Sequence, residues 1–294
     1  AGGGWENIMG TIRTNHPQML EPLSGGTMPV SLYFTQWLLV GIFTFALPQS
    51  VVRCMGYKDT KSLRGAMIGG TIIIGAMMIG VTALGVLSAG VLTGDLASYG
   101  GSVDNIIPRT IVETLPPWLA GVAIVGPVAA SISTVSSLLI ASSSAIIKDL
   151  WLHYADDRGQ QVSDAVVARS SQIITLGVGV IVFVLAVVPP SVIWKINMFA
   201  FGGLETAFCW VLVGALFFKR ASKVGAIASM VGGTAVYCLC MALGFKLFGL
   251  HQIVIGITVS LLCMVIGSWI GNRRANAADA AADAEMREVF FPEA

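Results

Sequence analysis

Long apolar stretches separated by short polar segments dominate this sequence. A bilayer core about 30 Å thick needs about 20 apolar helical residues to cross it. Seven stretches meet that requirement, at approximately residues 29–52, 63–92, 117–147, 165–188, 191–218, 222–248 and 252–271. The pattern predicts an all-α polytopic membrane protein with about seven transmembrane helices.

Two segments outside these spans also have an interpretable pattern. Residues 1–28 are polar and rich in Gly and Pro, which indicates an exposed loop. In residues 105–115, apolar side chains recur at helical spacing, which predicts a short helix lying at the membrane interface.

Basic residues are concentrated after the first, third, fifth and seventh spans. Only Arg13, Arg109, Lys195 and Lys246 fall on the opposite side. By the positive-inside rule, residues 1–28 are extracytoplasmic and the tail at 272–294 is cytoplasmic. The basic residues assigned to the cytoplasmic side are Arg53, Lys58, Lys61, Arg64, Lys148, Arg158, Arg169, Lys219, Arg220, Lys223, Arg273, Arg274 and Arg287.

Composition agrees with a lipid environment and excludes several classes of function. Hydrophobic residues make up 55% of the chain and charged residues 11%. No basic patch with interleaved aromatic residues suggests nucleic acid, and the five cysteines form no loop pair that would indicate disulfides or zinc. Neither a nucleophile-and-base motif nor a nucleotide-binding glycine motif occurs, so we expect neither an enzyme nor ATP-driven transport. The chain opens AGGGWENIMG without an initiating Met, which we interpret as a fragment whose earlier part is missing.

The third span carries an unusual number of hydroxyl groups. Ala130, Ser133 and Thr134 stand at i, i+3 and i+4, which places a carbonyl and two hydroxyls on one helix face. Such a face suits a hard, weakly charged cation, whereas hydrogen bonds to the preceding turn or to a neighbouring helix are the ordinary structural use of serine in membranes. The hydroxyl-bearing residues of this stretch are Ser131, Ser133, Thr134, Ser136, Ser137, Ser142, Ser143 and Ser144.

Two further features mark possible sites inside the bilayer. Glu205 lies about halfway along the fifth span, where an ionised carboxylate costs at least a few kcal/mol unless paired or hydrated. Its structural alternative is a protonated or hydrogen-bonded group. Pro48 in the first span removes a backbone bond near Thr44, which indicates either a simple kink or a broken helix that exposes backbone groups to a solute.

Three segments together resemble the sodium:solute symporter family: ALPQSVVRCMGYKD, AASISTVSSLLIASSSAIIKDL and FAFGGLETAF. The second of them is similar to the sodium-site helix of the family, and this implies sodium bound by Ala130, Ser133 and Thr134. Within the family, the first and third segments are most similar to the members that transport pantothenate. The resemblance therefore implies a bacterial inner-membrane symporter with sodium as the co-transported ion.

The resemblance also implies a LeuT-type fold of two inverted five-helix repeats. On that interpretation residues 29–218 are the second repeat and residues 219–271 form two peripheral transmembrane helices. Solute-facing positions are expected around residues 40–45, including Phe43 and Thr44, together with Glu205. The first repeat, which shares the sodium site in the family, is absent from the chain.

Three alternatives remain open from the sequence. A symporter of the same family for another small solute, such as an amino acid or a carboxylate, fits the same segments. A non-transporting membrane sensor or scaffold domain is a second alternative, and a channel is a third, because a serine-rich face does not distinguish a channel from a carrier.

Overall fold

The computed structural model describes residues 2–92, 94, 96–160, 162–187, 189 and 191–274. The predicted cytoplasmic tail lies outside the described residues from residue 275 onward. The described residues are helical and contain no strand, which confirms the predicted all-α class. Six helices are long and apolar enough to cross a membrane, or seven when the bent pair at residues 30–55 counts as one span. The protein is therefore a polytopic α-helical membrane protein.

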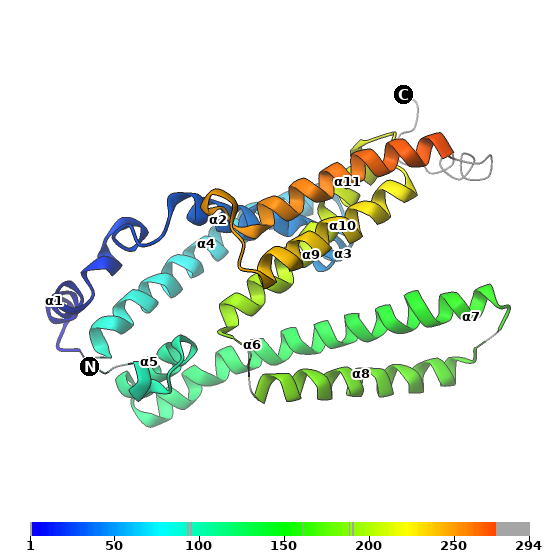
Figure 1. The fold of residues 1–294 in the computed structure, drawn as a ribbon. Coiled ribbons are helices and arrows are strands. Elements are labelled where there is room, and N and C mark those ends of the chain that lie inside the picture. The colour runs from blue at the N-terminus through cyan, green and yellow to red at the C-terminus, as the bar shows by residue number, and fades with distance from the viewer. Residues whose placement is uncertain are drawn as a thin grey trace. The chain divides into compact units, whose positions relative to one another are not determined.

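Figure 1 shows the order of the elements. The helices are α1 (Trp5–Asn15), α2 (Val30–Gly41), α3 (Pro48–Met55), α4 (Thr60–Val91), α5 (Ile106–Thr114), α6 (Pro117–Ser144), α7 (His153–Asp157), α8 (Asp164–Val187), α9 (Ile193–Phe217), α10 (Lys223–Ala242) and α11 (Gln252–Arg274). Short 3₁₀ turns are η1 (Pro17–Leu20), η2 (Pro22–Ser24), η3 (Phe43–Ala46), η4 (Leu96–Tyr99), η5 (Val103–Asn105) and η7 (Leu247–Gly249), and η6 (Ala145–Leu152) is a π-helical stretch.

The helices differ from the sequence-based expectation in three places. The segment expected to be a loop contains α1, in which Trp5, Ile8 and Ile12 stand at helical spacing and Ile12 is fully buried. The third span continues past Ile147 through η6 and α7, because a helix need not end where its apolar run ends. The sixth span ends early, since Gly244, Phe248 and Gly249 adopt positive φ angles that no α-helix accommodates.

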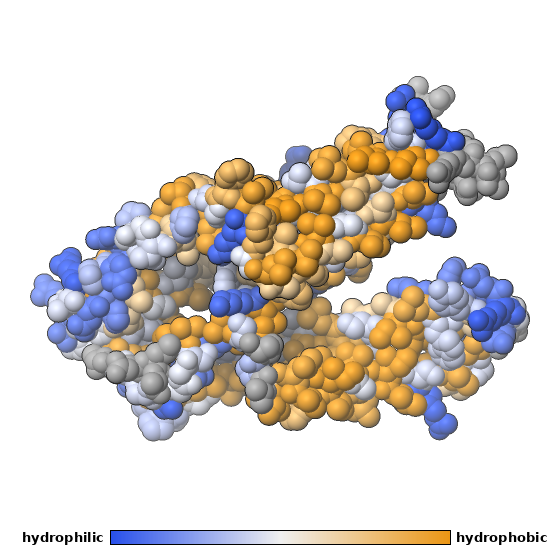
Figure 2. All heavy atoms as spheres, in the orientation of Figure 1, coloured by the Kyte–Doolittle hydropathy of each residue, from blue (hydrophilic) through white to orange (hydrophobic). Residues whose placement is uncertain are grey.

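The chain divides into two units, Ala1–Gly10 with Leu84–Ile193 and Thr11–Ala83 with Trp194–Ala294. In the first unit, α6 and α8 form a hairpin in which Thr175 donates a hydrogen bond of 2.8 Å to the Ser143 hydroxyl. Large side chains on α8 such as Leu176 and Phe183 are exposed, as expected of a lipid-facing surface. Figure 2 shows apolar residues along the visible side of α8 and hydrophilic residues gathered at α7.

In the second unit, glycine allows α10 and α11 to pack with their backbones in close approach. An added Cβ at Gly233 would lie 2.5 Å from the Ser260 Cβ, and one at Gly267 would lie 2.8 Å from the Gly225 Cα. Small residues at such an interface are how membrane helices pack. Gly267 and Gly271 therefore lie at a close helix contact, whereas Gly75 in α4 has open space around it.

The broken first span is joined to the turn between α10 and α11. The His251 backbone N–H donates to the Thr35 hydroxyl at 2.9 Å, and the Ser31 hydroxyl donates to the Gly249 carbonyl at 3.3 Å. The His251 Nδ1 accepts from the Ile253 N–H at 3.2 Å and so caps the start of α11. Burial, with a smaller contribution from the positive charge of Lys246, lowers the pKa of His251 to about 4.

The core of the second unit lies where α2, η3, α9, α10 and α11 meet. Its buried members are Leu39, Ala46, Met198, Cys209, Tyr237, Ile253 and Ile257. Phe43 packs against this cluster from the break in the first span. The core therefore connects the broken helix to α9, the helix that carries Glu205.

Candidate functional site

The predicted cation face lies on α6. The Thr134 hydroxyl donates to the Ala130 carbonyl at 3.1 Å, which places both oxygens on the same side of the helix. Because that hydrogen bond uses the hydroxyl proton, the lone pairs of the Thr134 oxygen remain available to a cation. Ala130, Ser133 and Thr134 are all exposed in the structure. The helix thus presents the predicted oxygens on an accessible face.

Most other hydroxyls of α6 have the ordinary structural role. Ser131, Ser136 and Ser137 each donate to the carbonyl four residues earlier, at 2.8, 2.8 and 2.9 Å. Ser143 donates to the Ile140 carbonyl at 3.1 Å and also accepts from the Thr175 hydroxyl of α8 at 2.8 Å. Both structural uses expected from the sequence therefore occur on this helix, alongside the candidate face.

The first span is broken, as Pro48 indicates, and not merely kinked. η3 ends at Ala46, Leu47 takes an extended conformation with φ −66° and ψ 128°, and Pro48 begins α3 at a bend of 47°. Pro48 has no N–H to donate to the Thr44 carbonyl, which instead accepts from the Leu47 N–H at 3.2 Å. The Thr44 carbonyl therefore keeps a hydrogen-bond partner through a 3₁₀-type bond. Phe43 and Thr44 are half-buried at the break.

Glu205 is fully buried in α9, and neither of its carboxyl oxygens has a hydrogen-bond partner among the described residues. The adjacent Thr206 hydroxyl donates to the Gly202 carbonyl and not to Glu205. A buried carboxyl group without a partner is costly, so its position calls for a functional or chemical reason.

The structure brings some of these residues into one unit and leaves others apart. Phe43, Thr44 and Glu205 belong to the second unit. Phe43 packs against the core cluster that contains Met198 and Cys209 of α9, the helix that carries Glu205. Ala130, Ser133 and Thr134 belong to the first unit. The candidate cation face and the candidate solute positions are therefore built on separate units.

A polar network beside Glu205 has no counterpart in the sequence-based prediction. The Tyr237 hydroxyl donates to the Met198 carbonyl at 2.9 Å, and the Ser260 hydroxyl donates to the Thr206 carbonyl at 2.9 Å. Ser229 and Ser260 share a further hydrogen bond of 2.8 Å. Single hydroxyls in apolar spans are too common to identify such contacts, which depend on how α9, α10 and α11 pack.

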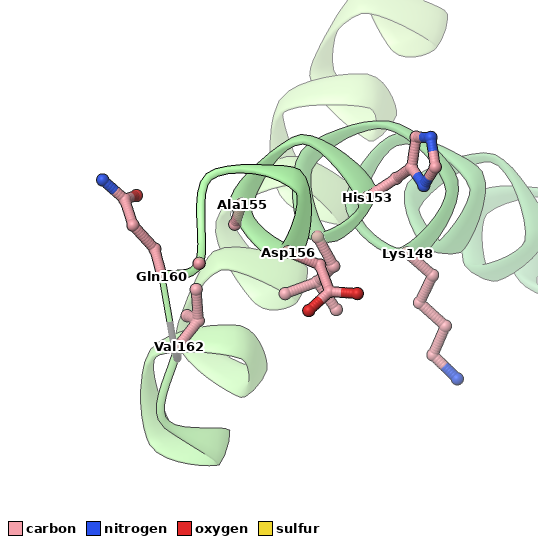
Figure 3. Close-up of a pocket in the computed structure, with 8 residues that line it drawn as sticks. Lys148, His153, Ala155, Asp156, Gln160 and Val162 are labelled. Atoms are coloured by element: carbon pink, nitrogen blue, oxygen red, sulfur yellow. The ribbon is translucent and has the colours of Figure 1, made fainter.

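A pocket of about 650 Å³ lies at the α7 end of the α6–α8 hairpin. In Figure 3, Lys148 and Asp156 point away from Gln160, so the polar groups of the pocket do not converge on one point. The pocket contains none of the residues predicted to bind sodium or solute. Its lining residues are Lys148, Leu152, His153, Ala155, Asp156, Gly159, Gln160 and Val162.

Comparison with known proteins identifies the family of this membrane protein. The model of the sodium:solute symporter family matches residues 1–233, which is most of the chain. The chain belongs to the sodium:solute symporter family.

Three individual relatives show which members of the family this chain is similar to. The chain is 35% identical over 273 residues to the sodium/pantothenate symporter of Haemophilus influenzae and 35% identical over 272 residues to that of Escherichia coli, covering 92% of this chain in each case. It is 26% identical over 277 residues to an osmoregulated proline transporter of Bacillus subtilis. The chain spans 55% of the length of each of these relatives. No solved structure gives a significant match.

Proposed function

We propose that this chain is the C-terminal part of a sodium-coupled symporter that imports pantothenate by alternating access. The observation that carries the proposal is the 35% identity to two sodium/pantothenate symporters over 92% of the chain. The broken first span and the hydroxyl-lined face of α6 support it, because both features are typical of secondary transporters.

In this proposal, sodium binds to the face of Ala130, Ser133 and Thr134. The Ala130 carbonyl and the two hydroxyls are neutral oxygen ligands, which suit a hard monovalent cation. These three residues supply part of a coordination shell, and a helix of the first repeat supplies the rest. The exposure of the face on α6 is compatible with a second group of ligands approaching it.

The solute binds beside the break in the first span. Phe43, Thr44 and Glu205 are the solute-facing positions, and all three belong to the same unit. Because binding of sodium and solute is linked, sodium raises solute affinity and solute raises sodium affinity by the same factor. Residues 29–218 correspond to the second inverted repeat, and residues 219–271 correspond to two peripheral helices.

The orientation in this proposal follows the distribution of basic residues. Residues 1–28 lie outside, the C-terminus lies in the cytoplasm, and the protein resides in a bacterial inner membrane. Sodium therefore binds from the outside and drives solute inward down its own gradient.

A second candidate solute is proline, because the chain is also 26% identical to a proline transporter over 94% of its length. The two solutes differ in chemistry: pantothenate carries a single negative charge at neutral pH, and proline is a zwitterion. A site that admits one of them by charge disfavours the other.

Uptake by the full-length protein in proteoliposomes tests the proposal. Labelled pantothenate should accumulate under an inward sodium gradient and should not accumulate under a matched potassium gradient. Excess unlabelled pantothenate should abolish the signal, and excess proline should leave it unchanged. Uptake that does not depend on the sodium gradient would contradict the symport proposal. Inhibition of uptake by unlabelled proline but not by unlabelled pantothenate would favour proline as the solute.

A further inference from the structure

The start of α10 and the end of α11 bring together basic residues that are far apart in the sequence. Arg220 precedes α10, Lys223 begins it, and Arg273 lies in the last turn of α11; all three are exposed. The Asn272 side-chain amide donates to the Arg220 carbonyl at 2.8 Å, so segments 52 residues apart lie side by side (Figure 1). These three basic residues define the basic end of the helix pair.

Backbone packing holds the two segments of the basic end against each other. The Ser222 N–H donates to the Ser268 hydroxyl at 3.2 Å. A Cβ added at Gly271 would lie 2.5 Å from the Ser222 hydroxyl oxygen and 3.1 Å from the Val224 Cβ. Small residues allow this close approach. The proximity of the two basic segments is therefore built into the fold and does not depend on how long side chains are oriented.

No acidic residue of these helices balances the charges of the basic end. The sequence contains no Asp or Glu between Glu205 and Asp279. Among the residues that the structure describes, no carboxylate lies within 4.0 Å of the side-chain nitrogens of Arg220, Lys223 or Arg273. By contrast, the basic segment before α4 and the segment that ends with α7 both include aspartates. The basic end therefore carries positive charge that is available to an anion.

Exposed apolar side chains adjoin the basic end. Trp269 lies one turn before Arg273 and is 56% exposed, and the Arg273 guanidinium carbon lies 3.7 Å from the centroid of its ring. Phe217 and Phe218, at the end of α9, are also exposed. Figure 2 shows hydrophilic residues at this end of the helices and apolar surface along the rest of them. Aromatic rings beside cations are typical of the level at which lipid headgroups lie.

An anionic phospholipid has both chemical groups that this surface suits. Its phosphate accepts hydrogen bonds from guanidinium and ammonium groups, and arginine binds phosphate in a bidentate manner. Its acyl chains cover exposed apolar side chains such as Val265 and Ile266 of α11. A soluble anion would leave that apolar surface uncovered. The combination of unbalanced positive charge and adjoining apolar surface therefore favours a lipid.

We propose that the basic end is a binding site for an anionic phospholipid. Arg220, Lys223 and Arg273 bind the phosphate, and the acyl chains lie along the exposed apolar side chains of α11. The Trp269 ring holds the Arg273 guanidinium at the level of the headgroup. Because the lipid contacts both α10 and α11, its binding stabilises their packing. The site is separate from the proposed transport activity and is the same whichever solute is carried.

Native mass spectrometry of the full-length protein tests the site without a transport measurement. Phosphatidylglycerol and phosphatidylcholine with identical acyl chains are titrated separately onto the protein in detergent, and the dissociation constant of the first bound lipid is measured. The wild type should bind phosphatidylglycerol several-fold more tightly. The triple variant Arg220→Gln, Lys223→Gln, Arg273→Gln should lose this preference, because each charge near a membrane surface contributes about fivefold to the binding of an anionic lipid.

A charge-matched variant separates a built site from general attraction to positive charge. Lys58→Gln, Lys61→Gln and Arg64→Gln together remove three charges from one exposed segment at the start of α4, and this variant should keep the preference. Asn272→Ala changes no charge but removes the hydrogen bond between the two basic segments. It should weaken phosphatidylglycerol binding several-fold and leave phosphatidylcholine binding unchanged.

Two results would overturn the proposal: equal binding of both lipids by the wild type, or an equal loss of preference in the two triple variants. If the triple variant of the basic end does not assemble, Asn272→Ala decides, because it keeps every charge. Unchanged phosphatidylglycerol binding in Asn272→Ala would then contradict a site built from both segments.

The acidic tail is the alternative occupant of the basic end. Asp279→Asn, Asp283→Asn, Glu285→Gln and Glu288→Gln together neutralise it. The wild type and this variant should both prefer phosphatidylglycerol. A preference that is absent from the wild type and present only in the neutralised variant would assign the basic end to the tail and overturn the lipid site.

Discussion

Replacement of Gly233 by Ala tests the close approach of α10 and α11. The new Cβ would lie 2.5 Å from the Ser260 Cβ and 3.0 Å from the Ser260 Cα. Ordinary contacts between carbon atoms are about 3.5–4.0 Å, so the two helices must separate by about 1 Å at this point. Both neighbours belong to the start of a side chain or to the backbone, so rotation of a flexible side chain cannot relieve the contact.

The energetic cost combines overpacking with weakened hydrogen bonds. Insertion of a methyl group into a well-packed core costs about 1–3 kcal/mol. Separation of the helices also stretches the bonds that Ser260 makes to Ser229 and to the Thr206 carbonyl, and side-chain hydrogen bonds in membranes average about 0.6 kcal/mol. We expect Gly233→Ala to destabilise the protein by about 2–4 kcal/mol.

Denaturant unfolding of the full-length protein in mixed micelles measures this difference. Gly75→Ala is the matched control, because no atom lies within 4 Å of the position of its Cβ and alanine favours the helix. Gly232→Ala should fall between them, since its new Cβ would meet the movable Cys263 sulfur at 2.8 Å. Equal stabilities of the Gly233 and Gly75 variants would refute the packing argument.

Two further predictions follow from hydrogen bonds in the structure. Thr175→Val removes the side-chain bond to Ser143 and should lower the free energy of unfolding by about 0.6–1.7 kcal/mol; Thr71→Val, whose hydroxyl bonds only within exposed α4, should cost less, and an equal loss would argue against a hairpin bond. His251 has a pKa of about 4 in the folded protein against 6.5 for an unperturbed histidine, so the unfolded state binds more protons between those values. Thermal stability should therefore fall as pH is lowered from 6.5 toward 4 and be insensitive to this group above 6.5; the same fall in His251→Gln would assign the effect to another residue.

The number and placement of the spans were predictable because lipid imposes one requirement on every span. Each must be helical, apolar and about 20 residues long, and the sequence shows these properties directly. A disturbance of the helix at Pro48 was predictable for a similar reason, since proline acts on its own backbone, but the sequence did not distinguish a break from a kink. The helix α1 was missed because Gly and Pro around it outweighed the weak spacing of Trp5, Ile8 and Ile12.

Contacts between helices were much less predictable. The glycines that pack closely are in α9, α10 and α11, whereas those inside α4, such as Gly75, have open space around them, and the sequence does not distinguish the two groups. The hydrogen bond from the Tyr237 hydroxyl to the Met198 carbonyl was found only in the structure, because a contact between two helices cannot be read from single hydroxyls in apolar spans. Glu205 could be identified as a candidate from the sequence alone, since a carboxyl group inside a span is rare whatever its neighbours are.

The sodium dependence of uptake by a Thr134→Ala variant tests the central claim most directly. Uptake of labelled pantothenate by the full-length protein is measured against sodium concentration, with Ser136→Ala as control because Ser136 is not one of the three proposed ligands and its hydroxyl donates to the Ile132 carbonyl. Loss of one hydroxyl ligand to a cation, at about 1.5 kcal/mol, should raise the sodium concentration for half-maximal uptake about tenfold. The control should match the wild type. An unchanged sodium requirement in both Thr134→Ala and Ser133→Ala would contradict the sodium site on α6.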